Sequence, residues 1–203
     1  KKQGIQPIVT ISHFDVPVHL IKKIGAWKSR KMIDYYLKLC KVLFERFKDY
    51  VEYWLTFNEI NMILHAPYMA AGLIFRDGDS EELIKYQAAH HELVASALAT
   101  KLAKEINPEN KIGCMFAAGS VYPYSCNPKD VWEALKIDRE NYFFADIQVR
   151  GKYPPYAIKE FQRKKIEIKM EELDEKNLEK YTVDFISFSY YNSRCRSEEH
   201  TSE

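Results

Sequence analysis

Four short segments rich in β-branched or aromatic residues alternate with longer helical patterns, and this alternation limits the folds that the chain can adopt. The predicted strands are residues 7–12, 51–57, 111–117 and 182–189. Long helices between short apolar strands favour right-handed crossovers and a parallel sheet. The 203 residues, 46% of them apolar, are enough to bury a single core. We therefore predict an α/β fold with four parallel strands.

Helix-end signals delimit the segments between the strands. Ser29 is a predicted cap for a helix that reaches Phe47, and Asp79 begins a predicted capping box for a helix that ends near Ile106. Asn127, followed by proline, predicts the start of a third helix. One or two short helices are expected over residues 156–180.

The turns after the strands distinguish two kinds of parallel sheet. No glycine-rich turn follows any strand and the chain has 7 glycines, which argues against a dinucleotide-binding sheet. A (βα)8 TIM barrel fits better, but a whole barrel needs eight strands and about 250 residues. We predict a partial (βα)8 TIM barrel over residues 1–195.

Charge and cysteine content exclude several classes of partner. The 30 basic and 29 acidic residues leave a formal net charge of +1, so we expect no nucleic-acid partner. Apolar runs are far shorter than the roughly 20 residues of a membrane span, so we expect no membrane partner. The four cysteines form no CxxC pair, which argues against a zinc site and favours a cytoplasmic location.

Polar residues follow the predicted strands at their carboxyl ends, where the active site of a barrel lies. They are His13, Asn58, Glu59, Ser120, Tyr122, Tyr190 and Tyr191. An imidazole, an amide, a carboxyl group and phenols suit hydroxyl-rich ligands and acid/base chemistry. One carboxylate and one imidazole do not make a divalent-metal site, so we predict no metal and no cofactor.

Several spaced motifs resemble family 1 glycoside hydrolases, which adopt the (βα)8 barrel. The sequence LTFNE at residues 55–59 matches the family's TFNE motif. Residues 11–17, 25–27, 151–154 and 184–191 resemble further family motifs in the same order. The resemblance covers residues 5–193 and implies about strands three to six of the barrel with their helices.

Further details resemble the 6-phospho-β-glucosidase branch of this family. Ile60 stands where plain β-glucosidases usually carry proline, and Ser189 takes the place of their asparagine. Residues 87–97 and 121–128 also resemble that branch. The resemblance implies a small-molecule β-glucoside substrate, 6-phosphorylated, whose phosphate-binding loop belongs outside this chain. Oligomeric state is open.

The resemblance also implies roles for four residues. Glu59 matches the acid/base, and Tyr191 matches the tyrosine that orients the nucleophile. Asn58 would bind the sugar 2-hydroxyl and His13 the 3-hydroxyl. A retaining glycosidase needs two carboxyl groups about 5–5.5 Å apart.

The nucleophile of the family is the glutamate of a seventh-strand ENG motif. Glu109 and Glu140 precede asparagines, but the first lies in a turn before a strand and the second inside a helix pattern. We therefore expect the chain to end before the nucleophile and to be inactive on its own.

Two other interpretations remain open at this stage. The chain could be a non-catalytic carbohydrate-binding module, or a fragment of a plain β-glucosidase or β-galactosidase. His90 and His91 lie within a helix pattern and are interpreted as structural. Residues 196–203 resemble the translation of a sequencing adapter, so we treat them as an artefactual tail outside the fold.

Overall fold

The computed structural model describes residues 3–200 and is built around a sheet of four parallel strands. These are β1 (Ile8–Ser12), β2 (Tyr53–Phe57), β3 (Lys111–Ala117) and β5 (Phe185–Ser189), in the spatial order β1-β2-β3-β5. Each neighbouring pair is parallel. The predicted α/β fold with four parallel strands is confirmed, although β2 and β5 begin later than predicted.

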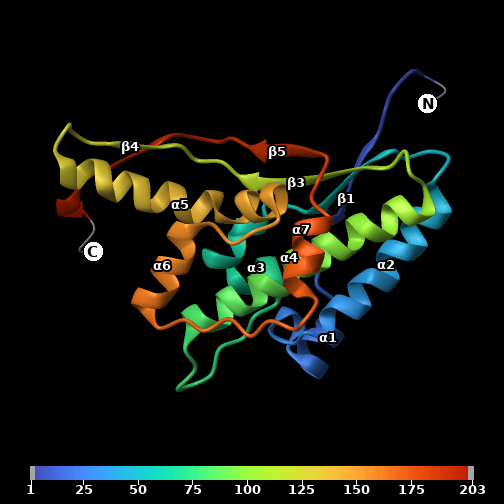
Figure 1. Cartoon of the computed structure of the whole chain (residues 1–203), viewed down its shortest axis with the longest axis horizontal. Coiled ribbons are helices and arrows are strands. Elements are labelled where there is room, and N and C mark those ends of the chain that lie inside the picture. The colour runs from blue at the N-terminus through green and yellow to red at the C-terminus, as the bar shows by residue number, and fades with distance from the viewer. Residues whose placement is uncertain (1–2, 201–203) are drawn as a thin grey trace.

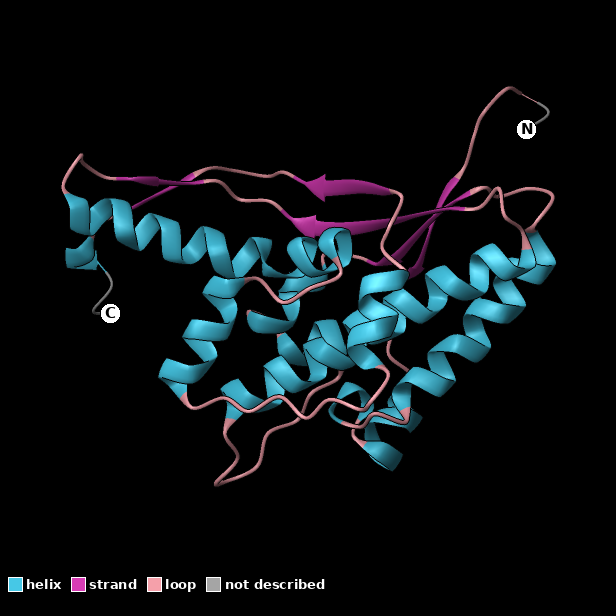
Figure 2. Cartoon of the chain, viewed as in Figure 1, coloured by secondary structure: helices cyan, strands magenta, loops and turns pink. Residues whose placement is uncertain are grey.

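Helices cover one face of this sheet (Figures 1 and 2). The three long helices are α2 (Met32–Phe47), α4 (Glu81–Ile106) and α5 (Pro128–Arg150). The shorter elements are α1 (Val18–Ile24), η1 (Ala26–Lys28), η2 (Ile60–Leu64), α3 (Pro67–Ala71), α6 (Pro155–Lys164), α7 (Asp174–Lys180) and η3 (Glu198–His200). Helices α2, α4 and α5 each connect consecutive strands of the sheet, as the alternation in the sequence predicts.

The helix-end predictions have mixed outcomes. Asn127 caps α5 as predicted, because its side chain accepts a hydrogen bond from the Lys129 backbone at 3.1 Å. Ser29 does not cap a helix start and instead ends η1. Asp79 does not cap α4, because its side chain accepts hydrogen bonds from other partners, including the Arg76 backbone. Ser80, which immediately precedes α4, forms no side-chain cap either. The predicted capping box is therefore wrong.

Aromatic side chains of β2 and α2 form the centre of the core between sheet and helices. Phe44 and Trp54 meet edge to face at 5.1 Å, and Tyr36 stacks on Phe57 at 4.7 Å. Cys40 lies among them with no exposed surface. Burying a side chain as large as that of Phe44 contributes about 1.5–3 kcal/mol to stability. This packing fixes β2 and therefore the residues that follow it.

A buried polar network confirms the structural interpretation of His90 and His91. Nε2 of His90 lies 2.9 Å from Oδ2 of Asp174 in α7, and Arg30 donates two hydrogen bonds to the same carboxylate. Nδ1 of His91 lies 2.9 Å from the backbone oxygen of Trp27. Burial lowers the pKa of both imidazoles. The network ties α7 to α4 and to the loop before α2.

A second, two-stranded sheet was not predicted. Strands β4 (Val121–Pro123) and β6 (Arg194–Arg196) pair in parallel beside the N-terminal end of α5 (Figure 1). The backbone N–H of Glu198 also donates to Asp130 at 3.0 Å. Part of the predicted tail therefore contacts the fold, and residues 201–203 lie outside the described part. Its assignment as an artefact stays a prediction.

Strands β1 and β5 are the edges of the main sheet within residues 3–200. Phe188 of β5 is 61% exposed, and Ile186 and Ile8 are also exposed on these strands. Edge strands with exposed apolar side chains favour association with other chains. In the same described range, every helix is too short or too polar to cross a membrane.

Candidate active site

The side chains of Glu59 and Tyr191 meet at the carboxyl ends of the strands. Glu59 follows β2 and Tyr191 follows β5, and the Tyr191 hydroxyl donates a hydrogen bond of 3.1 Å to Oε1 of Glu59. The Glu59 residue is 8% exposed, whereas Tyr191 is 79% exposed. A glutamate that is largely buried thus contacts an exposed phenol at the carboxyl ends of the strands, which we term the outlet of the sheet.

The register between β1 and β2 places His13 and Asn58 at the same level, each directly after its strand. Ser12 pairs with Phe57, so the next residue of each strand is a predicted site residue. The backbone N–H of Asn58 donates to the Ser12 oxygen at 2.9 Å, and the Asn58 residue is buried. His13 is exposed, and its backbone N–H donates to Asp15 at 2.8 Å. All four predicted residues therefore lie at the carboxyl ends of the strands.

The backbone of Glu59 has an unusual conformation that directs its side chain. Its φ of 40° and ψ of 55° are left-handed, which costs a residue with a Cβ about 1–2 kcal/mol. Its N–H donates to Sδ of Met115 in β3 at 3.2 Å. The following helix η2 is anchored by Ile60 and Ile63, which are buried. Packing on both sides therefore holds the strained residue in place.

Two residues next to Glu59 were not predicted as site residues. Met115 contacts the Glu59 backbone, and the Ser189 hydroxyl points to the same sulfur at 3.9 Å. Asn61 is 1% exposed and hydrogen-bonds the backbone of β3. A polar residue inside the otherwise apolar run INMIL is the signal that could have identified Asn61.

The remaining strand-end residues have partners of their own. The Tyr190 and Ser193 hydroxyls are 2.7 Å apart, and the Ser120 oxygen accepts the Arg194 N–H in the small sheet. Tyr122 lies in β4 and is exposed. These residues follow the strands, but their hydrogen-bond partners belong to the loops and the small sheet.

Glu109 and Glu140 lie away from the strand outlets, as predicted. Glu109 precedes β3 and therefore sits at the opposite end of the sheet. Glu140 is in the middle of α5, where burial raises its pKa. Neither glutamate follows the carboxyl end of a strand of the main sheet, as Glu59 does.

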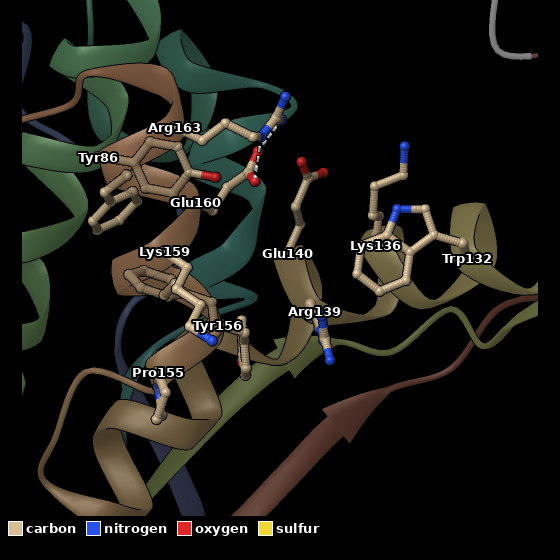
Figure 3. Close-up of a pocket in the computed structure, with 13 residues that line it drawn as sticks. Tyr86, Trp132, Lys136, Arg139, Glu140, Pro155, Tyr156, Lys159, Glu160 and Arg163 are labelled. Carbon is tan, nitrogen blue, oxygen red and sulfur yellow. Dashed lines mark hydrogen bonds and ion pairs between the residues drawn. The ribbon is translucent and has the colours of Figure 1, made fainter.

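A separate cavity of about 780 Å³ opens between α5 and α6 (Figure 3). Glu140, Trp132 and Arg139 of α5 line one side, and the Glu160–Arg163 ion pair of α6 lines the other. None of the four predicted site residues lines it. The four predicted site residues therefore lie at the carboxyl ends of the strands and not in this cavity.

Comparison with known proteins connects this chain to one enzyme family. The family model described as glycosyl hydrolase family 1 matches residues 1–203. The 6-phospho-beta-glucosidase AscB of Escherichia coli (strain K12) is 55% identical over 199 residues, which are 98% of this chain and 42% of that protein. The aryl-phospho-beta-D-glucosidase BglH of Bacillus subtilis (strain 168) is 48% identical over 196 residues, 97% of this chain and 42% of that protein.

Solved structures give the same result. The family 1 β-glucosidase from Thermotoga maritima superposes with a TM-score of 0.77 at 31% identity, over 95% of this chain and 42% of that chain. The chain thus spans about 42% of the length of these relatives.

Proposed function

This chain belongs to glycosyl hydrolase family 1, and on that basis we propose that it carries the acid/base half of a retaining 6-phospho-β-glucosidase active site. Its open sheet is part of the family's (βα)8 barrel, as the sequence predicts. We use "full-length enzyme" below for the complete polypeptide that we propose contains these 203 residues.

The contact between Glu59 and Tyr191 is the observation that carries the proposal. Barrel enzymes place catalytic groups at the carboxyl ends of their strands. Here Glu59, which is little exposed, and Tyr191 follow two different strands. A hydrogen bond joins the two side chains at the carboxyl ends of those strands. This arrangement supports Glu59 as the proton donor. The family resemblance assigns Tyr191 to orienting the nucleophile, and we keep that role for it beside its hydrogen bond to Glu59.

The chemistry assigned to Glu59 changes between the two steps of a retaining reaction. Protonated Glu59 donates to the glycosidic oxygen while a second carboxylate attacks the anomeric carbon. The aglycone leaves as a neutral alcohol or phenol, and a covalent glycosyl-enzyme remains. The Glu59 carboxylate then removes a proton from water as the water attacks that intermediate.

His13 and Asn58 are proposed to bind the sugar beside the reacting bond. The pairing of β1 with β2 supports this because it places the two residues next to each other at the outlet. An imidazole and an amide can each donate to and accept from a hydroxyl group. The family resemblance assigns His13 to the 3-hydroxyl and Asn58 to the 2-hydroxyl. We assign the pair to substrate binding and not to proton transfer.

We propose that the nucleophile comes from a segment outside the 203 residues. The positions of Glu109 and Glu140 support this, because neither lies at the strand outlets. Residues 196–200 contact α5, but we keep the proposal that residues 196–203 are a foreign tail and that residues 1–195 are the barrel segment.

The level of identity supports a phosphorylated substrate. The phospho-β-glucosidases AscB and BglH are 55% and 48% identical, whereas the β-glucosidase from Thermotoga maritima is 31% identical. A 6-phosphorylated β-glucoside is charged and does not cross membranes freely, so we propose that the enzyme acts in the cytoplasm. The thiols of Cys126 and Cys195, which are exposed and free, support that location.

The test compares two chromogenic substrates with the full-length enzyme. We expect hydrolysis of 4-nitrophenyl 6-phospho-β-glucoside and much slower hydrolysis of 4-nitrophenyl β-glucoside. Preference for the unphosphorylated substrate would identify a plain β-glucosidase instead. No hydrolysis of either, with sugar binding retained, would favour a non-catalytic carbohydrate-binding module.

A further inference from the structure

The hydrogen-bonded pairing between β2 and β3 stops before the candidate acid/base. The paired residues run only from Tyr53 and Lys111 to Leu55 and Gly113. On the other sides, β2 stays paired with β1 as far as Phe57, and β3 stays paired with β5 as far as Ala117. The two strands are therefore not joined by backbone pairing at the level of Glu59.

The side chain of Asn61 connects the two segments beyond this point. Its Nδ2 donates to the Ala117 oxygen at 3.0 Å, and its Oδ1 accepts the Ala117 N–H at 2.8 Å. One amide thus pairs with both backbone groups of a β3 residue, as a neighbouring strand would. Nδ2 also donates to Oδ1 of Asn141 in α5 at 3.2 Å. These three bonds fix the start of η2 to both β3 and α5.

We propose that Asn61 is a positioning residue that directs the carboxyl group of Glu59. Glu59 immediately precedes η2 and has a left-handed backbone, so its side-chain direction depends on how η2 is held. Such a conformation persists only when surrounding contacts stabilise it. Asn61 supplies two backbone hydrogen bonds to β3, and the contact between Glu59 N–H and the Met115 sulfur supplies the other link. This role rests on the proposed function of Glu59.

The pattern of bonds requires an amide and not a carboxylate. Asn61 donates to two oxygens and accepts from one N–H. An aspartate of the same shape would keep the acceptor but lose both donors. Its second oxygen would then face the Ala117 carbonyl and the Asn141 oxygen without a hydrogen. The substitution Asn61→Asp therefore changes the anchoring of η2 with almost no change in volume.

The experiment measures kcat/KM of the full-length enzyme on two aryl 6-phospho-β-glucosides that differ only in the acidity of the phenol. We expect Asn61→Asp to lower kcat/KM about 100-fold for the poor leaving group, the scale expected for a misplaced catalytic group. For the good leaving group, which needs little protonation, we expect a loss of about threefold or less. The ratio of the two losses is the readout, because reduced stability alone affects both substrates equally.

Asn110 offers a matched control at the opposite end of β3. It is fully buried, donates to the Ala103 oxygen at 2.9 Å and accepts from the Trp54 indole at 3.3 Å. Asn110→Asp removes a similar buried donor far from Glu59, so it should lower the unfolding temperature without changing the ratio. If Asn61→Asp does not fold, Asn61→Ser, which cannot span both groups of Ala117, replaces it under the same criterion.

The outcomes separate this proposal from the one on which it rests. Equal losses on both substrates, or no loss, would overturn the positioning role of Asn61 while leaving the glycosidase proposal intact. If the unmodified enzyme hydrolyses neither substrate, or if Glu59→Gln shows no dependence on the leaving group, the proposed function itself is wrong.

Discussion

The hydroxyl of Tyr191 donates a hydrogen bond of 3.1 Å to Oε1 of Glu59, although 132 positions separate the two residues in the sequence. The bond links the ends of β2 and β5, which are not neighbours in the sheet because β3 lies between them. It therefore joins the carboxyl ends of two strands that have no backbone pairing with each other.

Substitution of Glu59 by glutamine should impair the full-length enzyme most on poor leaving groups. A neutral amide keeps the shape of the side chain but cannot donate a proton as a carboxylic acid does. We expect kcat/KM to fall by about 10²–10⁴-fold for an aryl glucoside with a weakly acidic phenol, and far less for a dinitrophenyl glucoside. Equal losses on the two substrates would exclude Glu59 as the acid.

Removal of the Tyr191 hydroxyl tests the contact between the two residues. Glu59 becomes charged as it gives up its proton, and hydrogen bonds to charged groups contribute about 1.5–3 kcal/mol, so Tyr191→Phe should lower kcat/KM about 10- to 100-fold. Tyr190→Phe is the matched control, because its hydroxyl bonds to Ser193 instead. The assignment of Tyr191 fails if steady-state kinetics show the same small effect for both variants.

The buried carboxylate of Asp174 should make stability depend on pH. Burial alone would raise its pKa, but hydrogen bonds from Arg30, the Glu171 backbone and His90 outweigh burial and hold the pKa at about 2. Its stabilising effect is complete above the ordinary pKa of 3.8 and is lost as the pH falls toward 2. Asp174→Asn should cost about 2–4 kcal/mol at neutral pH, since Arg30 loses a buried partner.

Denaturant unfolding of the full-length enzyme at several pH values measures this effect. The difference in unfolding free energy between the original protein and Asp174→Asn should shrink as the pH falls from about 4 to about 2. His90 also makes the unfolding free energy of the original protein depend on pH. Its pKa is lowered in the folded state, so the unfolded state binds a proton first and stability decreases as the pH falls below 6.5. A difference that stays constant with pH would contradict the role of Asp174.

The 203-residue chain on its own should show no turnover of 4-nitrophenyl 6-phospho-β-glucoside. It holds one strand-end carboxyl group of the two that the reaction needs. We also expect it to associate, because β1 and β5 are open edges and Phe188 is exposed. Light scattering and a nitrophenol release assay on the purified chain check both points, and measurable hydrolysis would contradict the proposed location of the nucleophile.

Local sequence signals predicted the elements of the fold better than their exact ends. The four strands and the cap at Asn127 follow from short-range patterns, and the structure confirms them. Ser29 and Ser80 carry the same kind of signal but form no side-chain cap. Asp79 shows the reason, since its side chain is engaged by Lys28 from a distant part of the chain. A capping pattern competes with tertiary contacts that the local sequence does not contain.

The sequence by itself determined the order of strands and helices, the parallel sheet and the position of Glu59 and Tyr191 at the carboxyl ends of their strands. These features depend on periodicity and on the direction of each strand, which neighbouring residues encode. Only the tertiary structure decided that Tyr191 donates to Glu59, that Met115 accepts the Glu59 N–H and that Asn61 joins η2 to β3. Each of these contacts joins residues more than 50 positions apart, and their geometry depends on strand register and sheet curvature, which arise only when the whole core packs.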